Sequence, residues 1–152
     1  WTFRSLRRLR DHGGLLFLMT NQSGIGRGYF SQYQLEIIHD KLQARLEDAG
    51  AELTEIYYCP HAPEDNCECR KPETGMLREA AELYDVELKY AWVVGDNASD
   101  IQAGKNVDAR TILLEDRRSD HNPDASRPEP IHRVKNLWQA TELIIQDWEE
   151  AS

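Results

Sequence analysis

The chain has 152 residues, which suits a single domain, and 40% of them are hydrophobic, which is enough for a packed core. Its net charge of −9 argues against binding to the phosphate backbone of nucleic acids, and its mean hydropathy of −0.68 argues against a membrane span. The three cysteines lie close together and are too few for a disulfide framework, so they favour a metal site in a reducing, cytoplasmic compartment.

Short apolar strands alternate with amphipathic helices along the chain. Apolar runs predict five strands, at residues 15–19, 56–58, 91–94, 111–114 and 131–134. The first is expected to be buried on both faces, and the last is expected to be an edge strand. Helical spacing predicts helices at residues 3–12, 31–49, 74–84, 99–104 and 136–148.

Local signals mark the limits of these elements. Ser31 with Gln34 is a capping box, and Thr74 is expected to cap the helix that follows it. The polar, proline-rich residues 115–130 are expected to form a surface loop. The alternation predicts an α/β fold with a mostly parallel sheet, which binds ligands beyond the carboxyl ends of its strands.

A cluster of metal-ligand residues follows the second strand. Cys59 and His61 come directly after that strand, and Cys67 and Cys69 close the same loop. Three thiolates and one imidazole fill the coordination of a tetrahedral, structural zinc, and metal binding would supply the folding energy of a loop with little core. The alternatives are three unrelated buried cysteines or a Cys67–Cys69 disulfide, which would close a small, strained ring.

Polar residues also follow the first strand. Thr20 is followed by a loop that contains Gly24, Gly26 and Gly28, and its hydroxyl and backbone amides are donors that can surround an anion. The glycines permit a positive φ or a close approach of another chain segment. The alternative interpretation is a simple turn.

Two further segments carry charges suited to a phosphoryl group. Arg70 and Lys71 come directly after the cysteine loop and can neutralise phosphate, although two solvated cations are the alternative. Asp96 ends the third strand and Asp100 follows it on the next helix, which suits Mg²⁺. The alternative for Asp96 is a helix N-cap.

These segments, in this order, resemble the haloacid dehalogenase superfamily of phosphotransferases. The Cys-Pro-His, Cys-x-Cys and Cys-Arg-Lys-Pro segments resemble the subfamily that contains the D,D-heptose 1,7-bisphosphate and histidinol-phosphate phosphatases. The resemblance implies a single three-layer, Rossmann-like core over residues 1–152, with a zinc-binding loop at residues 59–69. It also implies both cofactors, Mg²⁺ and Zn²⁺.

The resemblance assigns roles to individual residues. It implies that Thr20 and Lys71 stabilise the transferring phosphoryl group, that Asp96 binds Mg²⁺ and that Asp100 lies in its second shell. The residues implied to bind substrate are Thr20, Asn21, Gln22, Ser23, Arg70, Lys71 and Asn97.

One family motif is absent from this sequence. In the family an Asp attacks phosphorus, and a second Asp two residues later protonates the leaving alkoxide and then activates water. No Asp in this chain has another Asp two residues after it, so both groups are expected upstream of Trp1 and the chain by itself is expected to be inactive. The strand that carries them is expected to be central, between the strands ending at Met19 and Val94. Its absence predicts that those two strands pair directly or form an intermolecular contact.

The expected function is Mg²⁺-dependent hydrolysis of a small sugar bisphosphate through an aspartyl-phosphate. Histidinol-phosphate hydrolysis is the alternative activity, and a non-catalytic protein that binds a phosphorylated metabolite is the alternative from another class. The expected partner is a small phosphorylated metabolite, with no nucleic acid and no membrane. The chain is expected to be a monomer, with strand-mediated association as the alternative.

Overall fold

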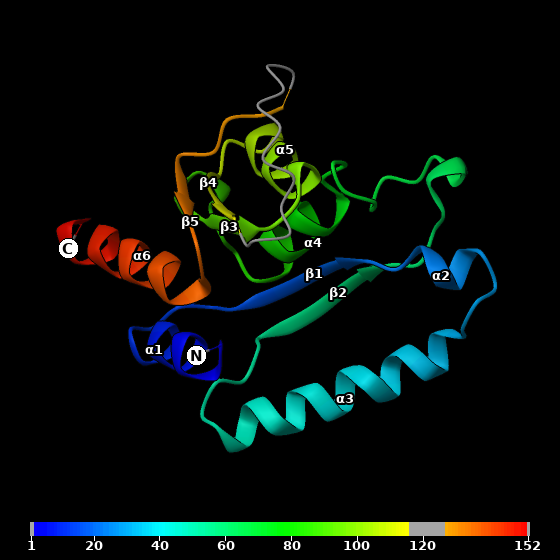
Figure 1. Cartoon of the computed structure of the whole chain (residues 1–152), viewed down its shortest axis with the longest axis horizontal. Helices are drawn as coiled ribbons and strands as arrows, with labels where there is room; N and C mark the ends of the chain where they lie inside the picture. The colour runs from blue at the N-terminus through cyan, green and yellow to red at the C-terminus, as the bar shows by residue number, and fades with distance from the viewer. Residues whose placement is uncertain (1, 116–126, 152) are drawn as a thin grey trace. The chain divides into compact units, whose positions relative to one another are not determined.

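The computed structural model describes residues 2–115 and 127–151, so residues 116–126 of the predicted 115–130 loop lie outside the described residues. The chain divides into two compact units, Trp1–Arg70 and Lys71–Ser152 (Figure 1). Each unit contains a small parallel sheet with helices, which confirms the predicted α/β class. Within the described residues, no helix is both long enough and apolar enough to cross a membrane.

The first unit is built on a pair of parallel strands. Strand β1 pairs with β2 in a register that places Thr20 opposite Tyr58, and helix α3 runs alongside the two strands (Figure 1). The elements of this unit are α1 (Thr2–Asp11), β1 (Phe17–Asn21), α2 (Ser23–Gly26), α3 (Gln32–Asp48), β2 (Glu55–Cys59) and the 3-10 turn η1 (Pro63–Asp65).

Strand β1 begins and ends later than the apolar run predicts. The prediction of residues 15–19 was wrong because pairing with β2 begins only at Phe17, opposite Glu55, and Leu15 remains 53% exposed. The ladder extends through Thr20 and Asn21, so polar residues form the carboxyl end of the strand. All five residues of β1 are half-buried rather than buried on both faces, since the strand has a partner on only one edge among the described residues.

Helix α3 confirms the capping box. The Ser31 hydroxyl accepts a hydrogen bond from the Gln34 amide at 3.1 Å, and the Gln34 side chain accepts one from the Ser31 amide at 2.8 Å. Among its apolar side chains, Leu35 and Leu46 are buried, whereas Ile38 is 60% exposed. Satisfying the amides of the first turn fixes where the helix starts.

The second unit contains a three-stranded parallel sheet in the order β3-β4-β5, which confirms an edge strand at the end. Helix α5 packs against β3 and β4, and α6 packs against β4 and β5. Ile101, Ile112 and Ile144 are buried in its core. The elements are α4 (Gly75–Leu83), the 3-10 turn η2 (Leu88–Tyr90), β3 (Trp92–Gly95), α5 (Ala98–Asn106), β4 (Arg110–Leu114), β5 (His132–Val134) and α6 (Leu137–Ala151).

Thr74 stands at the N-cap position of α4 but does not cap it through its side chain. Its backbone, with φ −108° and ψ 10°, is not in the extended conformation that lets an N-cap oxygen reach the first-turn amides. The Thr74 hydroxyl instead accepts a hydrogen bond from Arg78 Nε at 2.8 Å. The predicted side-chain cap was therefore wrong.

The predicted direct pairing of the first and third strands stays a prediction, because the two strands belong to separate units. Among the described residues, β1 pairs with β2 within the first unit, and β3 pairs with β4 within the second. The pairs β1–β2 and β3–β4 each join consecutive strands across an intervening helix, which is the connection that parallel strands favour. The alternative, an intermolecular contact, stays a prediction.

Candidate active site and metal centre

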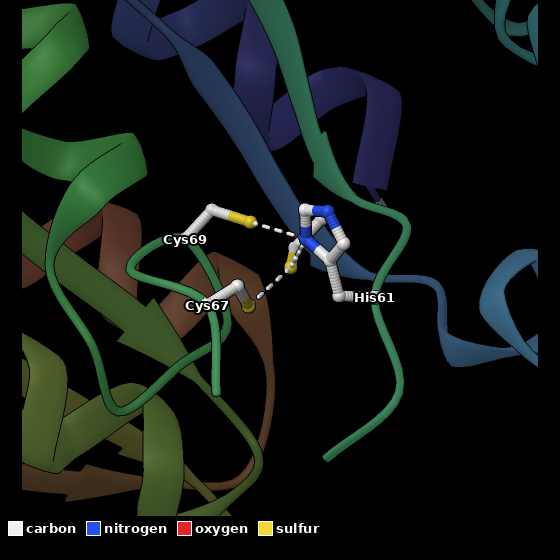
Figure 2. Close-up of side chains that lie close together, drawn as sticks. His61, Cys67 and Cys69 are labelled. Carbon is white, nitrogen blue, oxygen red and sulfur yellow. Dashed lines mark hydrogen bonds between the residues drawn. The ribbon is translucent and has the colours of Figure 1, made fainter. Parts of the chain in front are cut away.

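The four predicted zinc ligands converge in the first unit. Cys59 ends β2 and is fully buried, while the other three come from the loop at residues 59–69, which we call the metal loop. Their ligand atoms all lie within 4.8 Å of one another, and the side chain of Cys69 points toward the His61 imidazole (Figure 2). The Sγ atoms of Cys59 and Cys67 are 3.4 Å apart, and His61 Nδ1 lies 3.2 Å from Cys69 Sγ. All three cysteines are free, so the alternative of a Cys67–Cys69 disulfide was wrong.

The three thiols differ in their acidity because they share one small space. Burial raises the pKa of Cys59, and burial together with the neighbouring thiols raises the pKa of Cys69 to about 12. Burial by itself would also raise the pKa of Cys67. Hydrogen bonds outweigh this effect and lower that pKa to about 7; they come from the Cys59 and Cys69 thiols and from the Arg70 and Cys69 amides. A divalent cation would stabilise all three thiolates at once, so this donor set fits a soft metal such as zinc.

The end of β1 brings together part of the predicted substrate site. The Thr20 hydroxyl accepts a hydrogen bond from Gln22 Nε2 at 3.0 Å, and both side chains line a cavity of about 620 Å³ against α3. Asn21 is the last residue of β1, and Ser23 is the first of α2. Residues 20–28, which we call the strand-end loop, carry the predicted substrate-binding residues Thr20, Asn21, Gln22 and Ser23.

In the second unit, Lys71 and Asp100 form an ion pair between Lys71 Nζ and Asp100 Oδ1. The other carboxylate oxygen of Asp100 accepts a hydrogen bond from the Asn97 amide at 3.2 Å. The Asp100 side chain is only 9% exposed and that of Lys71 is 18% exposed. Both oxygens of Asp100 are thus occupied, and the lysine is anchored beside the carboxyl end of β3.

Asp96 directly follows β3 and is exposed. Its Oδ1 accepts a hydrogen bond from Asn97 Nδ2 at 3.1 Å. The N-cap position of α5 belongs to Asn97 rather than Asp96, so the alternative that Asp96 serves as the cap was wrong. An exposed carboxylate suits Mg²⁺, which commonly takes one or two carboxylates and keeps several waters.

Arg70 and Thr20 belong to the first unit, whereas Lys71, Asp96 and Asp100 belong to the second. Arg70 Nη1 is buried, and it has no hydrogen-bond partner among the described residues. A buried guanidinium nitrogen without a partner is costly, and an anionic oxygen is its natural ligand.

Comparison with known proteins connects these groups to one family. A family model described as HAD-hydrolase-like matches residues 68–140. A D-glycero-alpha-D-manno-heptose-1,7-bisphosphate 7-phosphatase of Photorhabdus laumondii is 37% identical over 146 residues, which cover 91% of this chain and 78% of that protein. This chain belongs to the haloacid dehalogenase family of phosphatases.

Further relatives of this chain are also named as phosphatases. A D-glycero-beta-D-manno-heptose-1,7-bisphosphate 7-phosphatase of Pseudomonas aeruginosa is 42% identical over 113 residues, and the chain spans 64% of that protein's length. A D,D-heptose 1,7-bisphosphate phosphatase from B. bronchiseptica, solved with magnesium and phosphate, superposes with a TM-score of 0.85 at 33% identity. That match covers 95% of this chain and 82% of the other chain.

One residue of this haloacid dehalogenase site was missed by the sequence reasoning. A Cβ atom added to Gly95 would collide with the Cβ and the carboxylate of Asp100. Only glycine therefore lets Asp100 fold back over the end of β3 and reach Lys71. The signal in the sequence was a glycine at a strand terminus, immediately before the predicted metal ligand Asp96.

Proposed function

We propose that this chain provides the phosphate- and magnesium-binding part of a phosphatase acting on a small sugar bisphosphate of the D-glycero-D-manno-heptose 1,7-bisphosphate type. The observation that carries the proposal is the Lys71–Asp100 ion pair beside the exposed carboxylate of Asp96. It combines a fixed cation with an oxygen ligand for Mg²⁺, and phosphoryl transfer depends chiefly on such charge stabilisation. The names of the relatives supply the substrate class.

In this proposal, each polar group acts on a specific part of the substrate. The Thr20 hydroxyl and the Lys71 ammonium stabilise the oxygens of the transferring phosphoryl group. Arg70 binds a substrate oxygen, which gives its buried Nη1 a partner. The residues proposed to line the rest of the substrate site are Asn21, Gln22, Ser23 and Asn97.

Asp96 would hold Mg²⁺, which supplies positive charge to the phosphate oxygens when bound. Asp100 would act on that ion indirectly, because its own oxygens bind Lys71 and the Asn97 amide. Mg²⁺ commonly takes one or two carboxylates and completes its coordination with water and phosphate, which suits this arrangement. The metal loop would hold a structural Zn²⁺ through Cys59, His61, Cys67 and Cys69.

We further propose that the 152-residue chain does not complete the reaction by itself. The family chemistry uses two aspartates separated by one residue, and this sequence contains no such pair. It would bind the phosphorylated substrate without forming a phosphoenzyme.

Phosphate release and binding on the 152-residue chain test the proposal together. Malachite green assays with both anomers of the heptose bisphosphate and with histidinol phosphate should give no release above background. Calorimetry with the heptose bisphosphate and Mg²⁺ should show binding that Lys71→Met abolishes and Lys89→Met, a change to an exposed lysine, preserves. Rapid turnover would contradict the proposed lack of a nucleophile, and equal binding by both variants would contradict the role of Lys71.

We also propose a cytoplasmic location, since three free thiols that bind zinc require a reducing compartment. Within its own sheet, as far as the described residues show, each of β1 and β3 is paired along one edge only, and this supports a second proposal, strand-mediated association of an otherwise monomeric chain. Sedimentation across a concentration series would test it: a monomer mass at all concentrations would rule out this association.

A further inference from the structure

The strand-end loop and the metal loop are joined through their backbones. The Gln22 amide donates a hydrogen bond to the Cys59 carbonyl at 2.7 Å, and the Gly26 amide donates one to the Pro60 carbonyl at 2.8 Å. Pro60 lies between Cys59 and His61, which are both proposed zinc ligands. A metal that fixes these two ligands would therefore fix the acceptors to which the strand-end loop is bonded.

Gly26 is the point of closest approach between the two loops. A Cβ atom at this position would lie 2.8 Å from both the Ala62 amide nitrogen and the Pro60 carbonyl oxygen, and 3.3 Å from the His61 carbonyl carbon. These neighbours are backbone atoms, which cannot rotate away as a side chain can. Any larger residue must push one loop away from the other, and so weaken both interloop hydrogen bonds.

We propose that Gly26 is a positioning residue that couples zinc in the metal loop to the order of Gln22 and Ser23 in the strand-end loop. The inference rests on the proposed zinc site. Occupancy of the metal loop holds the Cys59 and Pro60 carbonyls still, and these carbonyls hold the strand-end loop through the Gln22 and Gly26 amides. Coupling between two sites is reciprocal. If zinc orders the strand-end loop, then ordering of that loop must raise the affinity of the metal loop for zinc.

The side chains contribute little to this coupling. The ion pair between Arg27 and Glu64 also joins the two loops, at 3.6 Å, but its side chains are 42% and 71% exposed. Exposed pairs of this kind are worth little in water. The interloop backbone hydrogen bonds and the bare Cα of Gly26 are what transmit the effect.

The first test measures metal affinity in two matched variants of the full chain. Gly26→Ala should bind zinc about 10- to 100-fold more weakly in a chelator competition, as expected for loss of groups that support metal ligands. Gly28→Ala places the same methyl group two residues away, with nothing within 4 Å of the added Cβ. Its positive φ of 77° strains an alanine, so this variant controls for backbone strain in the strand-end loop without a clash against the metal loop. Its zinc affinity should stay well above that of Gly26→Ala.

Cobalt substitution separates a distorted site from general misfolding. The visible d–d and thiolate charge-transfer bands of Co²⁺ should shift in Gly26→Ala and stay unchanged in Gly28→Ala. A merely destabilised protein would keep the wild-type band positions at saturating Co²⁺. Unshifted bands together with wild-type zinc affinity in Gly26→Ala would overturn the inference.

The second test needs no substitution. Amide hydrogen exchange of the wild type should show faster exchange at Gln22 and Gly26 after a chelator removes zinc. The Thr54 amide, which bonds to the Leu16 carbonyl at 2.6 Å at the other end of the strand pair, should keep its rate. Equal rates at Gln22 and Gly26 with and without zinc would overturn the coupling while leaving the zinc site intact. A wild type that binds no zinc would overturn the zinc site and the coupling together.

Discussion

Replacing Lys71 by methionine should destabilise the second unit by much more than the loss of one surface charge. The substitution keeps a chain of similar length but leaves the Asp100 carboxylate without its cation. That side chain is only 9% exposed, so little water reaches it. Removing one partner of a buried ion pair costs about 3–5 kcal/mol. The Lys71 side chain is 18% exposed, which puts the expected loss near the lower limit, about 3 kcal/mol.

Such a loss is easily measured by thermal or urea unfolding. For a chain of this size, 1 kcal/mol corresponds to roughly 2–4 °C in Tm, so Lys71→Met should melt about 6–12 °C below the wild type. Lys89→Met is the matched control, because the Lys89–Glu87 pair spans 3.7 Å between side chains that are 64% and 68% exposed. Lys89→Met is expected to lower the free energy of unfolding by less than about 1 kcal/mol.

A double variant identifies the cause of the loss. Adding Asp100→Asn to Lys71→Met removes the unpaired charge, and the amide oxygen can still accept the hydrogen bond from the Asn97 amide. The double variant should therefore be more stable than Lys71→Met alone. If Lys71→Met and Lys89→Met melt at the same temperature, the buried ion pair does not stabilise the fold as argued.

Four further outcomes are expected. Gly95→Ala should lose roughly 1–3 kcal/mol in urea unfolding, because the added methyl group displaces Asp100, and wild-type stability would refute that packing. Ser31→Ala should lose about 1 kcal/mol by removing the acceptor of the Gln34 amide, and an unchanged midpoint would refute the cap. Chelation of zinc should unfold the metal loop, seen as loss of its amide protection, and retained protection would contradict a structural zinc. Mg²⁺ alone should bind weakly by calorimetry and more tightly with phosphate present, and equal affinity in both conditions would contradict a site completed by substrate.

The sequence was most informative where the chemistry is local. Four ligand residues in the stretch from Cys59 to Cys69 define a metal site almost independently of the rest of the fold, and the structure brings their atoms together. The capping box at Ser31 succeeded for the same reason, since its two hydrogen bonds join residues only three positions apart.

Long-range partners were harder to predict. Lys71 and Asp100 were each selected as site residues, but their ion pair links positions 29 residues apart and depends on how α5 packs at the end of β3. The role of Gly95 was missed, because a requirement for no side chain becomes visible only when the neighbouring Asp100 has been placed.

The predicted position of β1 differed from the observed one for a related reason. Apolar runs reveal burial, whereas the limits of a strand are set by its ladder, which here begins at Phe17 opposite Glu55. The consequence matters for the site, because Thr20 lies within the strand and its backbone is held by pairing with Tyr58. A hydroxyl on a paired strand is more rigidly placed than one on a free loop.

In the proposed site, the two aspartates after β3 would have different roles, one structural and one in ligand binding. One carboxylate oxygen of Asp100 pairs with Lys71 and the other accepts a hydrogen bond from the Asn97 amide, and the residue as a whole is only 6% exposed. Asp96 is exposed, and one of its oxygens bonds only to the side-chain amide of Asn97 among the contacts described. Displacing that amide costs far less than breaking a buried ion pair. The sequence pattern predicts a role near Mg²⁺ for both acids. Of the two, only Asp96 could turn its carboxylate toward an ion without disrupting a buried ion pair. In the proposed site, Asp100 would hold the lysine in place while Asp96 binds the ion, so the two acids would act on phosphate through different neighbours.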